Sequence, residues 1–159
     1  MIEKLKREDY LSVLLFLKEN RDSDFYYVDG ELRKYITDRK SLKQLLKKSK
    51  NIYICKERGD VIGIVLVWNH KNGALNRNFV KITATNTKTV KDLITVFLWN
   101  YYKELYIKIK KESKFLQIIK ERGFDFYRDR DKEILLYRHK TNPIINHDYD
   151  KDENPSVIK

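Results

Sequence analysis

The spacing of hydrophobic and polar positions predicts a mainly helical N-terminal third. The predicted elements are a short strand at Ile2–Lys6, helices at Glu8–Asn20 and Leu42–Ser49, a loop at Arg21–Gly30, and one or two helical turns at Glu31–Ile36. In the first helix, Leu11, Leu14, Leu15 and Leu17, together with Val13 and Phe16, recur at helical spacing, which indicates an amphipathic segment. Ser41 is predicted to cap the second helix, because a serine hydroxyl can accept a hydrogen bond from a backbone N–H at a helix start.

The middle of the chain changes to a strand pattern. Asn51–Lys56 alternates between Ile and other side chains, Val61–Trp68 is almost continuously apolar, and the glycine-containing turn Glu57–Asp60 joins the two. Together these segments predict a β-hairpin. A polar loop at His70–Arg77 is predicted to lead into the next strand, Phe79–Thr85.

The C-terminal half predicts helices alternating with strands. The predicted elements are a helix capped by Thr87 or Thr89 and ending near Tyr102, a strand at Glu104–Ile109, a helix from Ser113 to Arg122, and strands at Asp125–Arg128 and Glu133–Arg138. Gly123 follows the last helix, where left-handed backbone commonly ends a helix. The whole order is β-α-α-β-β-β-α-β-α-β-β, and its strand–helix–strand unit needs a right-handed parallel crossover. The expected fold is a mixed three-layer α/β sandwich.

Length and composition favour one globular domain. The chain has 159 residues, of which 42% are hydrophobic, so residues 1–139 are predicted to form one domain with its own core. Residues 140–159 have little apolar content and are predicted to be a flexible polar tail. The single Cys55 excludes an intramolecular disulfide and is expected to be a small buried side chain. Because no apolar run approaches the length of a membrane span, we expect a cytoplasmic protein.

The net charge of +11 favours anionic partners such as nucleic acid, a phosphorylated cofactor or an acidic protein. Lysines gather in two clusters, one at Lys40, Lys43, Lys47 and Lys50 and the other at Lys103, Lys108, Lys110, Lys111 and Lys114. Such clusters could contact phosphates without sequence preference. The alternative interpretation is that they are the solvated faces of two amphipathic helices on a lysine-rich surface, because no zinc-finger, helix-turn-helix or RNP signature accompanies them.

Three local features occur together with this order of elements. They are Asp60-Val-Ile-Gly63-Ile-Val in the hairpin return, a strand at Phe79–Thr85 that runs directly into a long helix, and Glu121-Arg-Gly-Phe124 after the last helix. In this combination, residues 1–139 resemble the GNAT superfamily of acyl-CoA-dependent N-acyltransferases. The resemblance implies a sandwich of GNAT type and a cofactor that is acetyl-CoA or another acyl-CoA.

The resemblance also implies where the cofactor would bind. In that superfamily, the backbone of one of two splayed parallel strands pairs with the pantetheine, and N–H groups at the next helix start bind the pyrophosphate. The implied residues are Ile82, Thr83, Ala84, Thr85, Thr87, Lys88, Thr89 and Lys91. The usual Arg/Gln-x-x-Gly-x-Gly/Ala loop is replaced by Thr85-Asn-Thr-Lys-Thr-Val-Lys91, which has no glycine. The threonine and lysine side chains could compensate, or could simply cap and solubilise the helix.

The usual catalytic positions also differ. The position at which the superfamily often carries a proton-donating Tyr is Ile119, and that of a frequent Asn is Glu112. Tyr106 and Tyr127 are the remaining candidates to protonate the leaving thiolate, although a buried Tyr is more often a packing residue. His70 and Glu31 are the candidates for a general base, with an exposed surface His as the alternative for His70.

Aromatic residues supply candidates for the acceptor site. Tyr26, Tyr27 and Trp68 could form its walls or stack on a base. The leading hypothesis is direct attack of an amine on the thioester of an acyl-CoA, with an oxyanion contact from strand backbone near Thr83–Thr85. One alternative is an inactive GNAT-like basic module that binds nucleic acid or an acidic protein. A third hypothesis is a structural or host-interaction protein.

Overall fold

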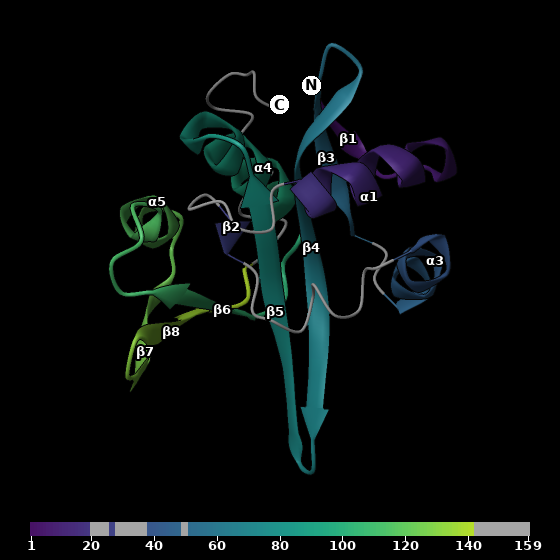
Figure 1. The fold of residues 1–159 in the computed structure, drawn as a ribbon. Coiled ribbons are helices and arrows are strands. Elements are labelled where there is room, and N and C mark those ends of the chain that lie inside the picture. Colours follow the sequence, from purple (N-terminus) through teal and green to yellow (C-terminus); the bar gives the residue numbers. More distant parts are fainter. Residues whose placement is uncertain (20–25, 28–37, 49–50, 142–159) are drawn as a thin grey trace, which may run out of the picture.

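A mixed β-sheet with helices on both faces forms the described part of the protein (Figure 1). The structure is a computed structural model that describes residues 1–19, 26–27, 38–48 and 51–141. In Figure 1, helices α4 and α5 lie on one side of the sheet, and α1 and α3 lie on the other. The described part therefore has the three layers that the order of elements predicts.

The sheet has eight strands in the described residues. Seven of them follow one another in the order β1 (Ile2–Lys4), β3 (Tyr53–Glu57), β4 (Asp60–Asn72), β5 (Leu75–Ala84), β6 (Leu105–Lys110), β8 (Glu133–Arg138) and β7 (Asp125–Arg130). The two-residue strand β2 (Tyr26–Tyr27) pairs with β5 outside this path. Among these strands only β5 and β6 pair in parallel. Their connection through α4 is the parallel crossover that the sequence predicts.

Four α-helices and one short 3₁₀ helix are described. They are the 3₁₀ helix η1 (Arg7–Asp9) and the α-helices α1 (Tyr10–Glu19), α3 (Arg39–Lys48), α4 (Thr87–Trp99) and α5 (Leu116–Glu121). The predicted helical turns at Glu31–Ile36 lie outside the described residues. None of the described helices is long and apolar enough to cross a membrane.

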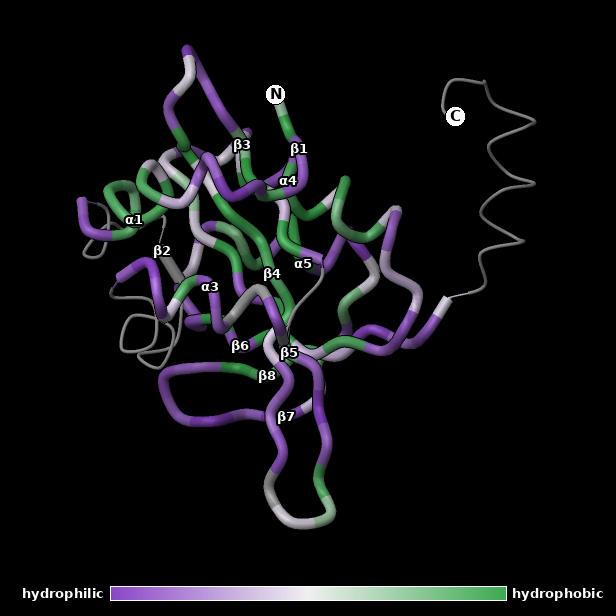
Figure 2. The backbone as a smooth tube through the Cα atoms, turned by 90° about the vertical axis from the view of Figure 1, so that its right-hand side faces the viewer, coloured by the Kyte–Doolittle hydropathy of each residue, from purple (hydrophilic) through white to green (hydrophobic). Residues whose placement is uncertain are grey.

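Two apolar clusters hold the layers together. The larger joins α4 and α5 to their face of the sheet through residues such as Phe97, Leu93 and Phe124. The smaller joins α1 and α3 to β3 and β4 through Val13, Leu42 and their neighbours. Figure 2 shows the same distribution, with hydrophobic residues in the middle of β4 and hydrophilic residues along β7 and along the two strands that lead to the paler tip of the β4–β5 hairpin. Burial of apolar area in these clusters is the main force that stabilises the fold.

Gly63 allows α4 to pack closely on β4. A Cβ atom at this position would lie 2.7 Å from Leu93 Cδ1 and 2.8 Å from Thr89 Cγ2. Real Cβ atoms do not approach other atoms so closely, so a larger residue would force the side chains of Leu93 and Thr89 to shift. This contact explains why a glycine stands in the middle of an otherwise apolar strand.

Several predicted boundaries were wrong for local reasons. The polar segment His70–Arg77 is not a loop, because β4 and β5 continue as a regular antiparallel pair until Asn72 opposes Leu75. The two strands support each other by backbone pairing at the far end, where the exposed side chains give no apolar pattern. Part of the predicted loop Arg21–Gly30 pairs with β5 as β2.

Predicted helix caps and helical burial also needed correction. Helix α3 begins at Arg39, and Asp38 accepts from the Ser41 N–H at 2.8 Å, while Ser41 Oγ accepts from the Asp38 N–H at 3.1 Å. Helix α5 begins at Leu116, three residues after the predicted cap Ser113. In α1, Leu11 and Leu15 are exposed, while Val13, Phe16 and Leu17 are buried. Cys55 is buried, as predicted.

Candidate functional site

The parallel strands β5 and β6 diverge from a single point. Their register pairing is limited to Phe79 opposite Tyr106. Beyond this pair, β5 continues to Ala84 and β6 to Lys110 without further pairing to each other. An opening between the carboxyl ends of neighbouring parallel strands is a common place for a ligand in α/β folds. We call the Phe79–Tyr106 pair the vertex of this opening.

The β5 edge that borders the opening is partly occupied. Strand β2 pairs with it in antiparallel register, with Tyr26 opposite Thr83 and Tyr27 opposite Ile82. The other edge of β5 is fully paired with β4. The backbone at Ile82 and Thr83, which the family resemblance assigns to the pantetheine, is therefore paired with the protein's own chain.

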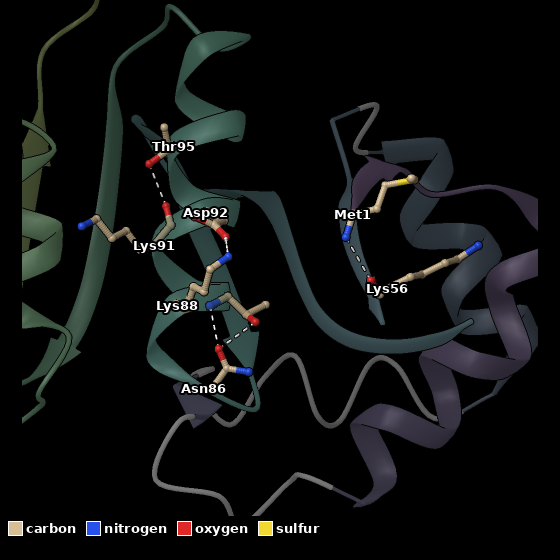
Figure 3. Close-up of polar contacts among 8 residues, drawn as sticks. Met1, Lys56, Asn86, Lys88, Lys91, Asp92 and Thr95 are labelled. Carbon is tan, nitrogen blue, oxygen red and sulfur yellow. Dashed lines mark hydrogen bonds and ion pairs between the residues drawn. The ribbon is translucent and has the colours of Figure 1, made fainter. Parts of the chain in front are cut away.

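Helix α4 starts directly after β5 and is capped by Asn86, not by Thr87 or Thr89 as predicted. Asn86 Oδ1 accepts hydrogen bonds from Thr89 N at 2.8 Å and from Thr89 Oγ1 at 2.9 Å (Figure 3). The first intrahelical bond runs from Val90 N–H to the Asn86 carbonyl. The N–H groups of Thr87 and Lys88 come before this bond, so neither has a carbonyl partner within the helix.

The predicted cofactor side chains around this helix start differ in exposure. Thr87, Lys88 and Lys91 are exposed, whereas Thr89 is buried beneath the helix and directs its hydroxyl to Asn86. Lys88 Nζ donates to Asp92 Oδ2 at 2.9 Å, and this hydrogen bond raises the pKa of Lys88. Ile82, Thr83 and Ala84 are buried. Their side chains are therefore not open to a ligand, and the backbone of Ile82 and Thr83 is paired with β2 and β4.

A groove of about 730 Å³ runs along the exposed side of α4. Its charged lining includes the cations Lys56, Lys88, Lys91, Arg122 and the Met1 amino group, against the carboxylates of Glu57 and Asp92. Figure 3 shows Lys88 and Lys91 on α4, with Met1 and Lys56 on the strands near it. Lys56 is paired with Asp9 at 2.6 Å and with Glu3 at 3.0 Å, and Lys88 is paired with Asp92. The free helix N–H groups and the nearby Lys91 are therefore the features that suit an anionic ligand.

Tyr106 and Tyr127 lie together beside the vertex. Their ring centroids are 5.4 Å apart in an edge-on arrangement, and the Arg77 guanidinium lies 4.9 Å from the Tyr106 ring centroid. Burial raises the pKa of Tyr106, and the neighbouring Tyr127 raises it further. Tyr106 therefore holds its proton at neutral pH and is suited to donate a proton rather than to accept one.

The other predicted site residues have fewer described contacts with the vertex. His70 is exposed on β4, and its ring centroid lies 6.4 Å from that of Phe79. Trp68 is half-buried opposite Phe79 and packs against the α1–α3 cluster. Glu31 lies outside the described residues. Tyr26 and Tyr27 are placed through their backbone pairing with β5.

Arg77, Glu104 and Tyr137 lie near the vertex and were missed from the sequence, whereas Thr83 was among the predicted cofactor residues. Tyr137 Oη donates to Glu104 Oε2 at 2.7 Å, and this hydrogen bond raises the pKa of Tyr137 to about 12. Thr83 is 1% exposed, and its Oγ1 is one of three buried side-chain polar atoms without a hydrogen-bond partner in the described residues. The alternation along the strands could have placed Tyr137 and Tyr106 on one face, but the β6–β8 register was needed to pair them. The described residues contain no group of three His, Cys, Asp or Glu side chains suited to a metal ion.

Solved structures with a similar arrangement of elements include several N-acetyltransferases. The ribosomal-protein-alanine N-acetyltransferase of Brucella melitensis superposes with a TM-score of 0.67 at 10% identity, over 87% of this chain and 99% of that one. The PaiA N-acetyltransferase of Thermoplasma acidophilum, solved in complex with coenzyme A, gives 0.63 at 12% identity, over 87% and 98%. The protein has the GNAT fold. A GNAT-family acetyltransferase of Streptococcus pneumoniae gives 0.63 at 13% identity, over 86% and 96%.

The GNAT fold predicted from the element order is thus confirmed, including its mixed α/β sheet. No protein-family model matches the sequence, and no curated protein matches it either. The fold has therefore been retained at an identity of 10–13% to these structures. At this distance the likeness establishes the fold, and activity has to be argued from the residues of the site.

Proposed function

We propose that the protein is an acyl-CoA-dependent N-acyltransferase that binds its cofactor in the opening between β5 and β6. The observation that carries this proposal is the single-pair vertex at Phe79 and Tyr106, together with the start of α4 directly after the end of β5. An extended pantetheine can pair with a strand edge, and a pyrophosphate suits the positive end of a helix. The coenzyme A complex of the Thermoplasma protein, which has the same fold, supports this type of cofactor.

The residues around the start of α4 supply the anion contacts in this proposal. The backbone N–H groups of Thr87 and Lys88 and the side chain of Lys91 are directed to the pyrophosphate. Lys88 would exchange its hydrogen bond with Asp92 for one with phosphate, since both are exposed at the same helix surface. These side-chain contacts would replace part of what a glycine-rich loop provides through its backbone.

The chemistry needs a proton donor near the leaving sulfur. The acceptor nitrogen attacks the thioester carbonyl, so that a C–N bond forms and the C–S bond breaks. The nitrogen releases one proton to water, and the leaving thiolate takes a proton from a donor. Tyr106 is the proposed donor, because it lies at the vertex and its raised pKa keeps it protonated. A backbone N–H at Thr83–Thr85 is proposed to stabilise the oxyanion.

Strand β2 must separate from β5 for this binding mode. Its pairing involves the same residues, Ile82 and Thr83, that would pair with the pantetheine. Two register positions make a short strand, and short edge pairings add little stability by themselves. We therefore expect the cofactor to compete with β2 for the β5 edge. The acceptor is proposed to be the amine of an anionic molecule, since the chain carries a net charge of +11.

A second candidate function is a GNAT-like module without catalysis that binds an anionic macromolecule. The pairing of β2 with Ile82 and Thr83 favours this candidate, because a protein that never binds acyl-CoA has no need to keep that edge open. The glycine-free start of α4 favours it for the same reason. The two candidates differ in one direct measurement, which is affinity for acyl-CoA.

Isothermal titration with acetyl-CoA tests the proposal. We expect micromolar binding that weakens about tenfold in Lys91→Ala, since a hydrogen bond to a charged group contributes about 1.5–3 kcal/mol. Lys88→Ala should give a similar loss. Lys71→Ala, at the exposed far end of β4, is the charge-matched control and should bind as the wild type does. Absence of heat at millimolar acetyl-CoA would reject the acyltransferase and leave the binding module.

A further inference from the structure

One half of the sheet face opposite α4 carries polar and aromatic side chains instead of an apolar cluster. In the described residues, the cluster under α1 and α3 includes residues of β3 and β4 but none of β5, β6, β7 or β8. Next to it, the same face of β5 presents Arg77, Phe79 and Lys81, which are register partners of His70, Trp68 and Leu66 on β4. The face therefore changes character between β4 and β5.

Strand alternation continues this character across the neighbouring strands. Leu105, Ile107 and Ile109 of β6 are buried in the α4–α5 cluster, so Tyr106 and Lys108 point to the opposite face. Register places Tyr106 next to both Phe79 and Tyr137. Residues of three strands thus form one continuous strip.

Aromatic rings run through this strip in direct contact. The Tyr106 ring centroid lies 5.8 Å from that of Phe79, 4.9 Å from that of Tyr137 and 5.4 Å from that of Tyr127. Tyr137 in turn lies 4.7 Å from His139. Tyr127 is 42% exposed, so its ring is open to a partner. Phe79 is only 6% exposed, so its ring packs against Tyr106 and is not open to a partner.

Cations lie against the same rings. The Arg77 guanidinium is 4.9 Å from the Tyr106 ring centroid and 5.6 Å from that of Tyr127. Arg128 lies 5.8 Å from the Tyr127 ring, and Lys108 lies 5.3 Å from Phe79. Glu104, the carboxylate bonded to Tyr137, accepts from its hydroxyl and leaves the balance of charge positive. We call this surface the tyrosine face, made of Arg77, Tyr106, Lys108, Tyr127, Arg128 and Tyr137.

We propose that the tyrosine face binds single-stranded nucleic acid. Flat rings and guanidinium planes stack on unpaired bases, and cations one side chain away contact the phosphates. A duplex keeps its bases inside and could use only the cations. An acidic protein would likewise use the cations and leave the rings without a role, although the net charge of +11 attracts any of these partners.

The tyrosine face is distinct from the proposed anion contacts at the start of α4. Tyr106 borders the vertex, so a bound strand would pass close to the opening between β5 and β6. Binding to the tyrosine face does not require acyl-CoA. The test is therefore made without cofactor, and its result is independent of whether acyl transfer occurs.

Fluorescence anisotropy with labelled twelve-nucleotide oligonucleotides tests this proposal. We expect oligo-dT, oligo-rU or both to bind more tightly than a twelve-base-pair duplex, and the DNA and RNA arms identify which nucleic acid is preferred. Tyr127→Ala should weaken binding about tenfold, since one stacked base is lost. Phe126→Ala is the matched control, because Phe126 is an exposed neighbouring ring whose register partner Leu136 belongs to the α4–α5 cluster.

A salt series separates phosphate contacts from general charge. Arg77→Gln should reduce the slope of log K against log salt by about 0.7 for a single strand. Arg58→Gln, at the exposed β3–β4 turn, removes the same charge and should leave the slope unchanged. The proposal is overturned by equal losses in Tyr127→Ala and Phe126→Ala, by tighter binding to duplex, or by no binding to either single strand at low salt. Circular dichroism of each variant confirms that it is folded.

Discussion

The two faces of the sheet differ in what their side chains do. On the α4–α5 face, the strands bury an unbroken set of apolar residues, from Val80 in β5 to Leu136 in β8. On the other face, the apolar cluster under α1 and α3 ends at β4. The remaining strands bury Phe79 and Leu135 there but also carry tyrosines, lysines and arginines. Successive residues of the same strand, such as Tyr106 and Ile107, serve these different purposes. The α4–α5 face is apolar across the sheet, whereas the other face has an apolar cluster, among the described residues, only under α1 and α3.

The largest expected effect comes from truncating a ring on the apolar face. Phe97 in α4 is 0% exposed, and Phe97→Ala should lower the free energy of unfolding by about 3–5 kcal/mol through lost burial and a cavity. Tyr127→Ala on the other face should cost less than about 1 kcal/mol, since that ring is exposed. Urea unfolding of both variants measures the difference. Similar losses would show that the tyrosine face is also part of the core.

The next effect concerns the contact between Gly63 in β4 and helix α4 on the apolar face. Gly63→Ala places a Cβ atom 2.7 Å from Leu93 Cδ1 and should destabilise the protein by about 1–3 kcal/mol. A double-mutant cycle with Leu93→Ala is the control, because removing Cδ1 relieves the nearest clash. The glycine substitution should therefore cost less in the Leu93→Ala background. Strict additivity would mean that the clash is not with Leu93.

The order of elements could be predicted because hydrophobic periodicity follows burial on the apolar face, and the GNAT fold followed from the resemblance of that order and its motifs to a known family. The alternation in β6 and the spacing in α4 both arise from contact with the larger cluster. Prediction was wrong where backbone pairing alone determines structure. The β4–β5 extension and β2 are held by their neighbours, and their exposed or polar residues give no apolar period.

The candidate site was predictable only where it follows from the fold. Residues at the start of α4 lie in sequence order, so the segment Ile82–Lys91 could be assigned from the resemblance. The tyrosine face depends on the register between β5, β6 and β8, which brings Arg77, Tyr106 and Tyr137 together from distant positions. The sequence alone does not give that register, and Arg77 and Tyr137 were therefore missed.

A smaller effect is expected at the helix cap that borders the cofactor opening. Asn86→Ala removes the acceptor of the Thr89 N–H and should cost about 1 kcal/mol in the free energy of unfolding. Asn86→Asp keeps an acceptor and should retain stability, while its added charge should weaken acetyl-CoA binding in the proposed site. Thermal unfolding and titration calorimetry measure the two effects separately. A loss of stability in Asn86→Asp equal to that in Asn86→Ala would contradict the capping role.

The smallest effect tests whether the tyrosine face adds stability through a polar contact. The hydrogen bond to Glu104 raises the pKa of Tyr137 from 10.0 to about 12, so the folded protein retains this proton where the unfolded chain loses it. The stability from this contact is therefore fully present below pH 10 and is lost as the pH rises towards 12. Because Tyr137 is near the surface, solvent screening keeps the contribution small.

Titration of ring-labelled tyrosines by NMR measures the ionisation of Tyr137 directly, with Tyr137→Phe to assign its signal. Glu104→Gln removes the main cause of the shift, and the pKa of Tyr137 should fall towards 10.0. Glu112→Gln, an exposed carboxylate outside the tyrosine face, should leave it unchanged. If Tyr137 ionised near pH 10 in the wild type, the Glu104 contact would not persist in solution. The tyrosine face would then depend on the apolar face for all of its order.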